Sequence, residues 1–476
     1  MAITTQAHKP PAADVTKLAA KTILTGKETR PALRTELPGP RSRSIVARDD
    51  AALATTTKTA PVTGVRGKGV VVEDADGNIL LDFCAGIGVL NTGHSHPAVV
   101  KAIQDQAARL VHFAGTDFYY DQQVTLAERL GKLVPIQGPT KVFYTQSGTE
   151  SNEAAIKVAK HATGRQMFLA FLGAFHGRTQ GSLALTTSKA KHREGFFPAM
   201  PGVVHTPFPN PYRNTWRIDG YAEPEELANR AIEHIETLLE AACPAKETAA
   251  VFWEPVQGEG GYVVPPKMFP KMLRGVCDDH GILLAADEVQ TGFGRTGKWF
   301  ASEHFGVRAD IVSLAKAMGS GMPIGATVFR AKLDFREQGK HSNTYGGNVL
   351  GCAASLATLD VMQREKLVEN SAKMGKHLEK RLEEMKEQHA AIGDRRGLGL
   401  MQAIEFVKPG SQQKTMGGEP DPKMQKAIEE GCWKRGLILL SCGKSSLRVI
   451  PALNVTKDQI DGAMDILGEA LTAAGA

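Results

Sequence analysis

The stretch "ILLAADEV" (282–289) decides the fold, because five apolar residues in a row end abruptly in two acidic ones. A strand with this sequence has no polar face, so other elements must cover it on both sides. Strands of this kind are typical of parallel sheets whose two faces carry helices. The acidic pair would then lie at the carboxyl end of the strand, where open α/β sheets bind their ligands.

Similar runs surround this stretch between residues 140 and 330. They are "KVFYT" (141–145), "MFLAF" (167–171), "AAVFWEPV" (249–256) and "IVSLAKA" (311–317). Amphipathic segments separate them, as expected for helices that connect parallel strands. The sequence therefore predicts an α/β protein with a mostly parallel sheet flanked by helices.

The flanking regions predict a smaller α+β domain built from both ends of the chain. Residues 65–83 read as a hairpin around an Asp-Gly-Asn turn, and residues 96–111 have helical apolar spacing. Residues 365–388 predict a long amphipathic helix, and residues 398–407 and 437–443 predict further strands. We found no internal repeat that would favour a solenoid.

These patterns divide the chain into four parts. Residues 1–35 are polar and basic and predict a flexible tail, with an organellar transit peptide as the alternative. Residues 36–107 are expected to form the N-terminal segment of the small domain. Residues 108–363 would form the large domain, and residues 364–476 the C-terminal part of the small domain.

The composition excludes several classes of protein. The chain has 476 residues, 42% of them hydrophobic, and a net charge of +6, which is small for this length and does not indicate nucleic-acid binding. No apolar run reaches the roughly 18 residues that a membrane span needs. The six cysteines form no C-x-x-C pair and no zinc-finger spacing, so we expect no metal site. A reduced, cytoplasmic setting is the simplest expectation.

The first stretch with chemical meaning is "YTQSGTESNEAAIKVAK" (144–160). A predicted strand ends, Ser147, Gly148 and Thr149 follow, and a helix begins. Free backbone N–H groups and the helix dipole at such a point favour an anion, ideally a phosphate. Ordinary capping of the helix by Ser or Thr is the alternative.

The second is the end of the opening stretch, where Asp287 could be a metal ligand, a turn residue or the partner of a buried cation. A G-x-G-x-x-G pattern follows at Gly292, Gly294 and Gly297. It is a poor dinucleotide fingerprint, because acidic residues precede it and no amphipathic helix opens at its third glycine. An NAD-binding or non-enzymatic sheet protein is nevertheless the alternative from another class.

Two further stretches follow predicted strands. "GAFHGRT" (173–179) offers an aromatic ring, His176 as a base or a structural residue, and Arg178 to bind a carboxylate. "EPVQGEGGY" (254–262) places two glutamates five residues apart on a glycine-rich loop.

The last stretch, "IVSLAKAMGSGMP" (311–323), sets Lys316 between an apolar strand and small residues. The lysine either extends its amine to water or is a desolvated nucleophile, since burial lowers the pKa of an amine. Together the stretches place a phosphate site, an aromatic ring, a strand-end aspartate and a lysine on one sheet edge. These are the parts that a pyridoxal 5′-phosphate site requires.

The sequence resembles the class III, fold type I, pyridoxal-phosphate aminotransferases, and the 4-aminobutyrate aminotransferase branch most closely. The resemblance covers about residues 65–465. It rests on seven ordered motifs: "AGIGVLNTGHSHP", "SGTESNEAAIKVA", "FHGRT", "EPVQGEGG", "ADEVQTGFGRTGK", "AKAMGSGMPIGA" and "TYGGNVLGCAA". The resemblance implies a ping-pong transamination between a small amino donor and a 2-oxo acid, with 4-aminobutyrate and 2-oxoglutarate as the expected pair.

The resemblance also implies roles for individual residues. Lys316 matches the lysine that binds the cofactor covalently and transfers the proton, and Asp287 matches the residue on the pyridine nitrogen. The other cofactor-binding positions that match are Ser147, Gly148 and Thr149 for the phosphate, Phe175 for ring stacking, Gln290 near the phenolic oxygen, and Thr344, which the family often donates across a homodimer. Pairing of dimers into a tetramer stays open.

Substrate recognition is implied less specifically. Arg178 matches the arginine that binds the distal carboxylate of 4-aminobutyrate, and equally the one that binds the α-carboxylate in ornithine and acetylornithine aminotransferases. Ile87 replaces a tyrosine typical of ornithine enzymes but does not exclude acetylornithine. Arg448 and Glu259 match an arginine for the α-carboxylate and the glutamate that pairs with it. An amino-acid racemase on the same scaffold is a further alternative.

Overall fold

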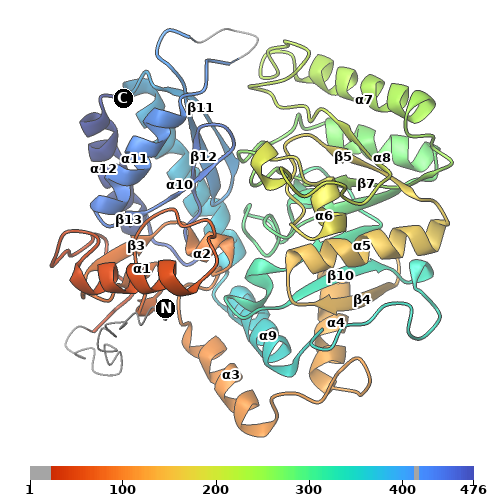
Figure 1. Cartoon of the computed structure of the whole chain (residues 1–476), viewed down its shortest axis with the longest axis horizontal. Helices are drawn as coiled ribbons and strands as arrows, with labels where there is room; N and C mark the ends of the chain where they lie inside the picture. Colours follow the sequence, from red (N-terminus) through yellow and green to blue (C-terminus); the bar gives the residue numbers. More distant parts are fainter. Residues whose placement is uncertain (1–22, 412–416) are drawn as a thin grey trace, which may run out of the picture.

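The computed structural model describes residues 23–411 and 417–476, so residues 1–22 of the predicted tail lie outside the described part. Figure 1 shows two lobes, with a large sheet domain at the right and a smaller domain, built from both ends of the chain, at the left. The domain boundaries drawn from the sequence stay a prediction.

A seven-stranded sheet forms the centre of the large domain. Its order is β4 (Thr140–Thr145), β10 (Gly325–Arg330), β9 (Ile311–Leu314), β8 (Leu283–Asp287), β7 (Thr248–Trp253), β5 (Met167–Phe171) and β6 (Val203–Thr206). Among these strands only β10 runs antiparallel, to β4 on one side and β9 on the other. The predicted mostly parallel sheet is therefore confirmed.

The alternation of side chains along the strands explains why both faces of this sheet are covered. On β5, Leu169 and Phe171 pack into one apolar core with α7 (Pro224–Ala241) and α8 (Phe269–Asp279). Phe168 and Ala170 point the other way and pack against α5 (Gly148–Thr163). Burying each large apolar side chain contributes about 1.5–3 kcal/mol, so the layered arrangement follows from strands that are apolar on both faces.

The small domain joins segments that are far apart in sequence. One sheet has the order β1 (Arg66–Lys68), β2 (Val71–Glu73), β3 (Ile79–Asp82) and β13 (Leu437–Ile438). Its β13 lies parallel to β3, with Leu437 opposite Leu81. A second, antiparallel sheet has the order β11 (Ile392–Leu398), β12 (Met401–Phe406), β15 (Ser446–Val449) and β14 (Leu440–Cys442).

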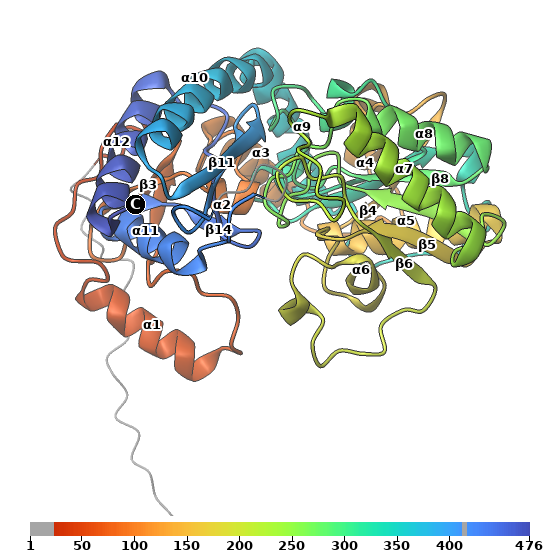
Figure 2. The same cartoon turned by 90° about the horizontal axis from the view of Figure 1, so that it is seen from above.

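The remaining helices connect and cover these sheets, and Figure 2 shows α10 and α12 on the outside of the small domain. They are α1 (Pro40–Ala52), α2 (Ala85–Gly88), α3 (Pro97–Arg109), α4 (Asp121–Leu133), α6 (Gln180–Leu185), α9 (Val349–Arg364), α10 (Leu367–Gln388), α11 (Pro422–Lys434) and α12 (Lys457–Ala474). Short 3₁₀ turns lie at Ala190–His192, Ala301–His304, Lys316–Gly319 and Ala331–Leu333. No helix in the described ranges is both long and apolar enough to cross a bilayer.

The described part of the predicted tail lies against the small domain. Ala32 forms a β-bridge with Ile79, and the Gln459 side chain donates to the carbonyls of Gly26 and Glu28. These contacts connect residues 23–35 to β3 and α12.

The carboxyl ends of the parallel strands carry the segments singled out in the sequence. Asp287 is the last residue of β8, and Lys316 follows β9 by two positions. The G-x-G-x-x-G pattern at 292–297 lies in turns and opens no helix. It therefore lacks the strand-to-helix context that a dinucleotide fingerprint requires.

Candidate active site

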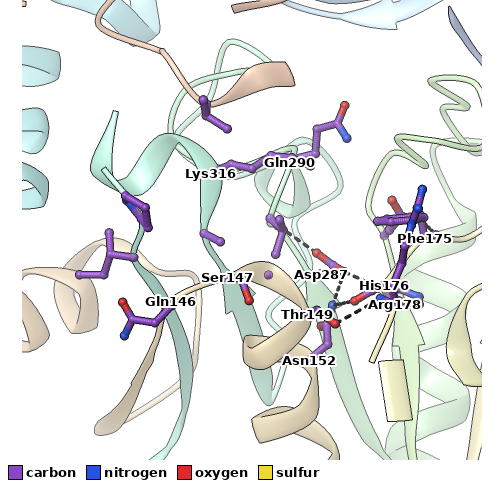
Figure 3. Close-up of a pocket in the computed structure, with 18 of the residues that line it drawn as sticks. Gln146, Ser147, Thr149, Asn152, Phe175, His176, Arg178, Asp287, Gln290 and Lys316 are labelled. Atoms are coloured by element: carbon purple, nitrogen blue, oxygen red, sulfur yellow. Dashed lines mark hydrogen bonds and ion pairs between the residues drawn. The ribbon is translucent and has the colours of Figure 1, made fainter. Parts of the chain in front are cut away.

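A cavity of about 460 Å³ lies where these strands end. Figure 3 shows Lys316, Asp287, Phe175 and Ser147 around the same space. Its wall includes eight of the predicted site residues: Ser147, Gly148, Thr149, Phe175, Arg178, Asp287, Gln290 and Lys316. Because these residues come from four separate chain segments, the fold and not sequence proximity brings them together.

Lys316 stands on a strained backbone. Its φ of 45° lies in the left-handed region, which costs an L-residue roughly 1–2 kcal/mol. The strand β9 ends just before it, and small residues follow it. Burial lowers the pKa of the Lys316 ammonium; the Asp287 charge opposes this, and the Arg448 charge adds to it. The amine is therefore closer to its neutral, nucleophilic form than a lysine in water.

Asp287 is a buried carboxylate that Asn152, His176 and a backbone amide hold in place. Its Oδ2 accepts hydrogen bonds from Asn152 Nδ2 at 2.8 Å and from His176 Nδ1 at 2.8 Å, and its Oδ1 accepts from the Val289 amide at 3.0 Å. Burial alone would lower the pKa of His176, but the hydrogen bond and charge of Asp287, with the charge of Glu254, raise it. The carboxylate is thus oriented from behind and faces the cavity.

Glu254 is a second carboxyl in the cavity wall. Its Oε1 accepts from the Gly258 amide and its Oε2 from the Phe175 amide, each at 3.0 Å. Burial raises its pKa to about 7, against the attraction of His176, and the Asp287 charge adds to the rise. The carboxyl therefore ties the Phe175 loop to the 254–262 loop while changing its charge near neutral pH.

The N-terminus of α5 borders the cavity and has the free amides that an anion would need. Ser147 caps the helix by accepting from the Glu150 amide at 3.4 Å, and the amides of Gly148 and Thr149 have no intrahelical partner. A Cβ at Gly148 would lie 2.7 Å from a Val289 methyl, and a Cβ at Gly177 would lie 2.1 Å from Thr149 Oγ1. Both glycines therefore permit a closeness of backbone and side chains that other residues would block.

Two arginines near the cavity differ in whether a carboxylate is paired with the guanidinium. The Arg178 guanidinium lies 5.9 Å from the Phe175 ring and forms no ion pair with any described residue. The side chain of Arg448, on β15, is 6% exposed, and its Nη2 lies 2.8 Å from Glu259 Oε2. Lys189 Nζ lies 2.9 Å from the other oxygen, Glu259 Oε1.

Four predicted residues are not part of the cavity wall. Glu259 and Arg448 lie beside it, close enough for their charges to affect the pKa of Lys316. Ile87 is 51% exposed and adopts a φ of 70° two positions before Val89, which does line the cavity. Thr344 is exposed, in a segment whose Asn343 side chain donates to the Tyr144 carbonyl at 2.9 Å.

Sequence reasoning did not assign several residues of the site. Asn152 is one helical turn after Gly148, on the same face of α5, so a search for polar residues four positions after the predicted phosphate site would have found it. Tyr262, whose hydroxyl donates to Gln290 Oε1 at 2.8 Å, is a non-glycine residue with a φ of 57°. Lys189 gave no signal, because its contact with Glu259 spans 70 residues.

The cavity fits pyridoxal phosphate on three observations of the structure. A helix N-terminus with space for an anion, a buried carboxylate held by hydrogen-bond donors, and a desolvated amine all border one space. A phosphate, a protonated ring nitrogen and an aldehyde carbon are their respective complements. Ser147, Gly148 and Thr149 would hold the phosphate, and Phe175 would cover the ring.

Comparisons with known proteins agree with this chemistry. The sequence model of the class III aminotransferases matches residues 52–471. The chain is 39% identical to an alanine/serine racemase from Pyrococcus horikoshii, with 91% of each chain covered. It is 37% identical to a probable 4-aminobutyrate aminotransferase from Bacillus subtilis, over 86% of this chain and 92% of the relative.

Solved structures lead to the same family. An (S)-enantioselective omega-transaminase from Thermomicrobium roseum superposes with a TM-score of 0.82 at 32% identity, covering 91% of this chain and 98% of the other. An amine transaminase from an uncultivated Pseudomonas species, in its PLP-bound form, gives 0.81 at 30% identity, covering 89% and 98%. With its fold, its cavity and its sequence all of this type, the chain belongs to the class III aminotransferases, which are fold type I enzymes that use pyridoxal phosphate.

Proposed function

We propose that the protein transfers the terminal amino group of an ω-amino acid, with 4-aminobutyrate as the best representative, to 2-oxoglutarate. The products would be succinate semialdehyde and glutamate. The observation that carries the proposal is the unequal state of the two arginines. Glu259 neutralises Arg448, whereas Arg178 is open. A donor with a carboxylate at its far end and none on the reacting carbon matches this arrangement, since no buried cation is left unpaired.

Each residue of the site has a separate role in the proposed reaction. Pyridoxal phosphate, when bound, supplies an electron sink for the negative charge that develops on the reacting carbon. Lys316 Nζ removes the proton from the amine-bearing carbon of the donor and later delivers it as an acid. Asp287 keeps a proton on the ring nitrogen, and His176 and Asn152 hold Asp287 in orientation.

The acceptor half of the reaction requires a change at Glu259. 2-Oxoglutarate and glutamate carry two carboxylates, one of which is bonded to the reacting carbon. Arg178 would bind the distal carboxylate, and Arg448 the one beside the reacting carbon. We expect Glu259 to leave Arg448 for this to happen, because its carboxylate, at 2.8 Å, and the carboxylate of the ligand would repel each other beside the same guanidinium.

A half-reaction screen tests the proposal. The visible absorbance of the holoenzyme is followed after mixing with 4-aminobutyrate, ornithine, acetylornithine, lysine or neutral amino acids, without an acceptor. We expect 4-aminobutyrate to give the largest second-order rate constant and succinate semialdehyde to accumulate. A larger constant for ornithine or acetylornithine would overturn the assignment of the donor.

Racemisation is the second function that the comparisons favour. Besides the alanine/serine racemase, an isoleucine 2-epimerase from Lentilactobacillus buchneri is 37% identical over 85% of this chain and 88% of the relative. A racemase exchanges the α-proton of its substrate and keeps the amine. In deuterated water, rapid uptake of deuterium at the α-carbon of L-alanine, with appearance of D-alanine and no keto acid, would favour this function over transamination.

We also propose that the enzyme is a cytoplasmic homodimer in which Thr344 completes the phosphate site of the other subunit. Exposed apolar side chains support an interface near that site: Leu110, Val111, Phe113, Phe118, Tyr119 and Tyr345. The Tyr345 carbonyl accepts a hydrogen bond from Gln146, which directly precedes the phosphate site. The six cysteines are buried and unpaired, as is typical of proteins in a reducing compartment.

A further inference from the structure

Lys189 is a charged residue beside the active site that no step of the proposed reaction uses. It follows α6, two residues before Lys191 on the same loop. Its side chain is 37% exposed, and its one ion pair within the described ranges is the contact to Glu259 at 2.9 Å. Glu259 therefore lies between two cations, with one carboxylate oxygen on Lys189 and the other on Arg448.

The two cations that bind Glu259 belong to different parts of the protein and do not depend on each other for their positions. Arg448 also donates to the Ser441 carbonyl from Nη2 at 2.7 Å and from Nε at 3.2 Å, so β14 keeps its guanidinium in place without Glu259. Lys189 belongs to the loop after α6, in the large domain. A carboxylate that leaves Arg448 can thus remain on Lys189.

The backbone of the loop favours rotation of the Glu259 side chain over movement of the chain. The Glu259 carbonyl accepts from the Gly443 amide at 2.8 Å, and Arg396 donates to the Gly261 carbonyl at 2.7 Å. A Cβ at Gly260 would lie 2.4 Å from the Gly173 carbonyl, which shows how closely this backbone is packed. The carboxylate is consequently the part that can move.

We propose that Lys189 is a positioning residue that holds Glu259 whenever a carboxylate beside the reacting carbon occupies Arg448. The inference rests on the proposed function, because it requires donors and acceptors with and without that carboxylate. Without Lys189, a displaced Glu259 would be a partly buried carboxylate with no partner, and the exchange would be less favourable. Ligands that leave Glu259 on Arg448 would not meet this cost.

Ligand binding to the holoenzyme separates the two cases without turnover. Glutarate has two carboxylates and requires both arginines, whereas butyrate has one and requires Arg178 alone. For Lys189→Met, calorimetry should give a glutarate Kd raised about five- to tenfold, the lower end of the range expected when a partly buried carboxylate loses its partner, and a butyrate Kd within about twofold of the wild type. Lys189→Arg should recover most of the glutarate affinity.

Two controls exclude a general loss of positive charge. Lys191→Met removes the same charge two residues away, where the side chain is exposed, and should change neither ligand by more than about twofold. In a Glu259→Gln background, Lys189→Met should have no further effect on glutarate, because the residue acts through Glu259. The half-reaction with glutamate should show the loss in KM and not in kcat, and that with 4-aminobutyrate should show none.

The outcomes distinguish the two proposals. Equal losses for glutarate and butyrate, an unchanged glutarate Kd in Lys189→Met, or an effect that persists in the Glu259→Gln background would overturn the role of Lys189 alone. A wild-type holoenzyme that binds glutarate no better than butyrate, or that does not react with 4-aminobutyrate, would overturn the proposed function and this inference with it.

Discussion

Lys316 combines two unfavourable features, a left-handed backbone and a desolvated amine, at one position. Strain of this kind persists only where the surroundings determine the conformation, and it concentrates at functional sites. Four charged neighbours affect the pKa of the Lys316 amine, and they do so from different positions. Asp287 and Glu254 lie on the cavity wall, whereas Glu259 and Arg448 reach the amine only through their charges. Individual residues thus set the reactivity of the amine.

Replacement of the lysine tests the assignment directly. Lys316→Ala should reduce transamination to no more than a trace, since both the covalent attachment and the proton transfer depend on Nζ. Circular dichroism and the thermal midpoint should stay close to the wild type. A variant with substantial remaining turnover would show that another group transfers the proton.

Asp287→Asn tests the support of the ring nitrogen. Loss of one charge-assisted hydrogen bond at a buried site is worth roughly 2–4 kcal/mol, so the half-reaction should slow about 30- to 1,000-fold. Stopped-flow absorbance with 4-aminobutyrate measures the constant. An unchanged constant would remove Asp287 from the mechanism.

Glu254 should make stability depend on pH. Burial raises its pKa in the folded protein from 4.5 to about 7, so the folded state binds the proton more tightly than the unfolded state. This contribution is complete below about pH 4.5 and is lost as pH rises through about 7. Relative to Glu254→Gln, the wild type should lose roughly 1–3 kcal/mol of unfolding free energy over that range. If the wild type and Glu254→Gln differ in unfolding free energy by the same amount at pH 5 and at pH 8, the shift is contradicted.

At the scale of elements, the strands position the chemistry and the loops complete it. The runs that are apolar on both faces predicted five of the seven strands of the large sheet correctly. Strand β6 is only four residues long, and β10 begins at a glycine and reverses direction, so neither gave a pattern of the same kind. The sequence cannot show such a reversal, because neighbours in the sheet, and not local preference, determine it.

The same limit applies to the site. Residues at strand ends, such as Asp287 and Lys316, were predictable because the end of a parallel strand has a fixed place in the fold. The contacts of Glu259 with Lys189 and Arg448 span 70 and 189 residues. They depend on how two loops and the small domain meet, which no local pattern encodes.

The N-terminus of α5 offers a test at this scale. Gly148→Ala places a Cβ about 2.7 Å from a Val289 methyl and should weaken pyridoxal phosphate binding at least about tenfold, measured as the Kd of the reconstituted apoprotein. Gly275→Ala in α8 is a matched control, because its Cβ meets nothing within 4 Å. That variant should leave the Kd unchanged and stabilise the fold by up to about 1 kcal/mol. Equal affinities for both variants would contradict tight packing at the phosphate site.

At the scale of the whole molecule, Phe113, Phe118 and Tyr345 are exposed apolar residues, and the Tyr345 carbonyl accepts a hydrogen bond from Gln146, next to the proposed phosphate site. Phe113 and Phe118 stack at 4.3 Å, yet each is about half exposed. A surface of this kind is favourable only when another surface covers it. Activity and assembly would therefore depend on each other.

Disruption of this surface tests that dependence. Phe118→Arg should convert the proposed dimer to a monomer in sedimentation velocity and weaken cofactor retention, because Thr344 would no longer reach the other subunit. Glu240→Arg, on the exposed face of α7, is the control and should change neither property. A Phe118→Arg variant that stays dimeric with full cofactor would exclude this surface as the interface.

The pairing of β13 with β3 has a consequence for synthesis on the ribosome. Leu81 emerges early, but its neighbour Leu437 follows more than 350 residues later. At roughly 5–20 residues per second, the first three strands would wait on the order of tens of seconds for their fourth. All strands of the central sheet lie within residues 140–330 and have emerged about 100 residues before Leu437. The nascent chain therefore carries an unpaired edge of β3 while the residues of the central sheet are already available to fold, and we expect a chaperone that shields early-emerging strands to act on this segment.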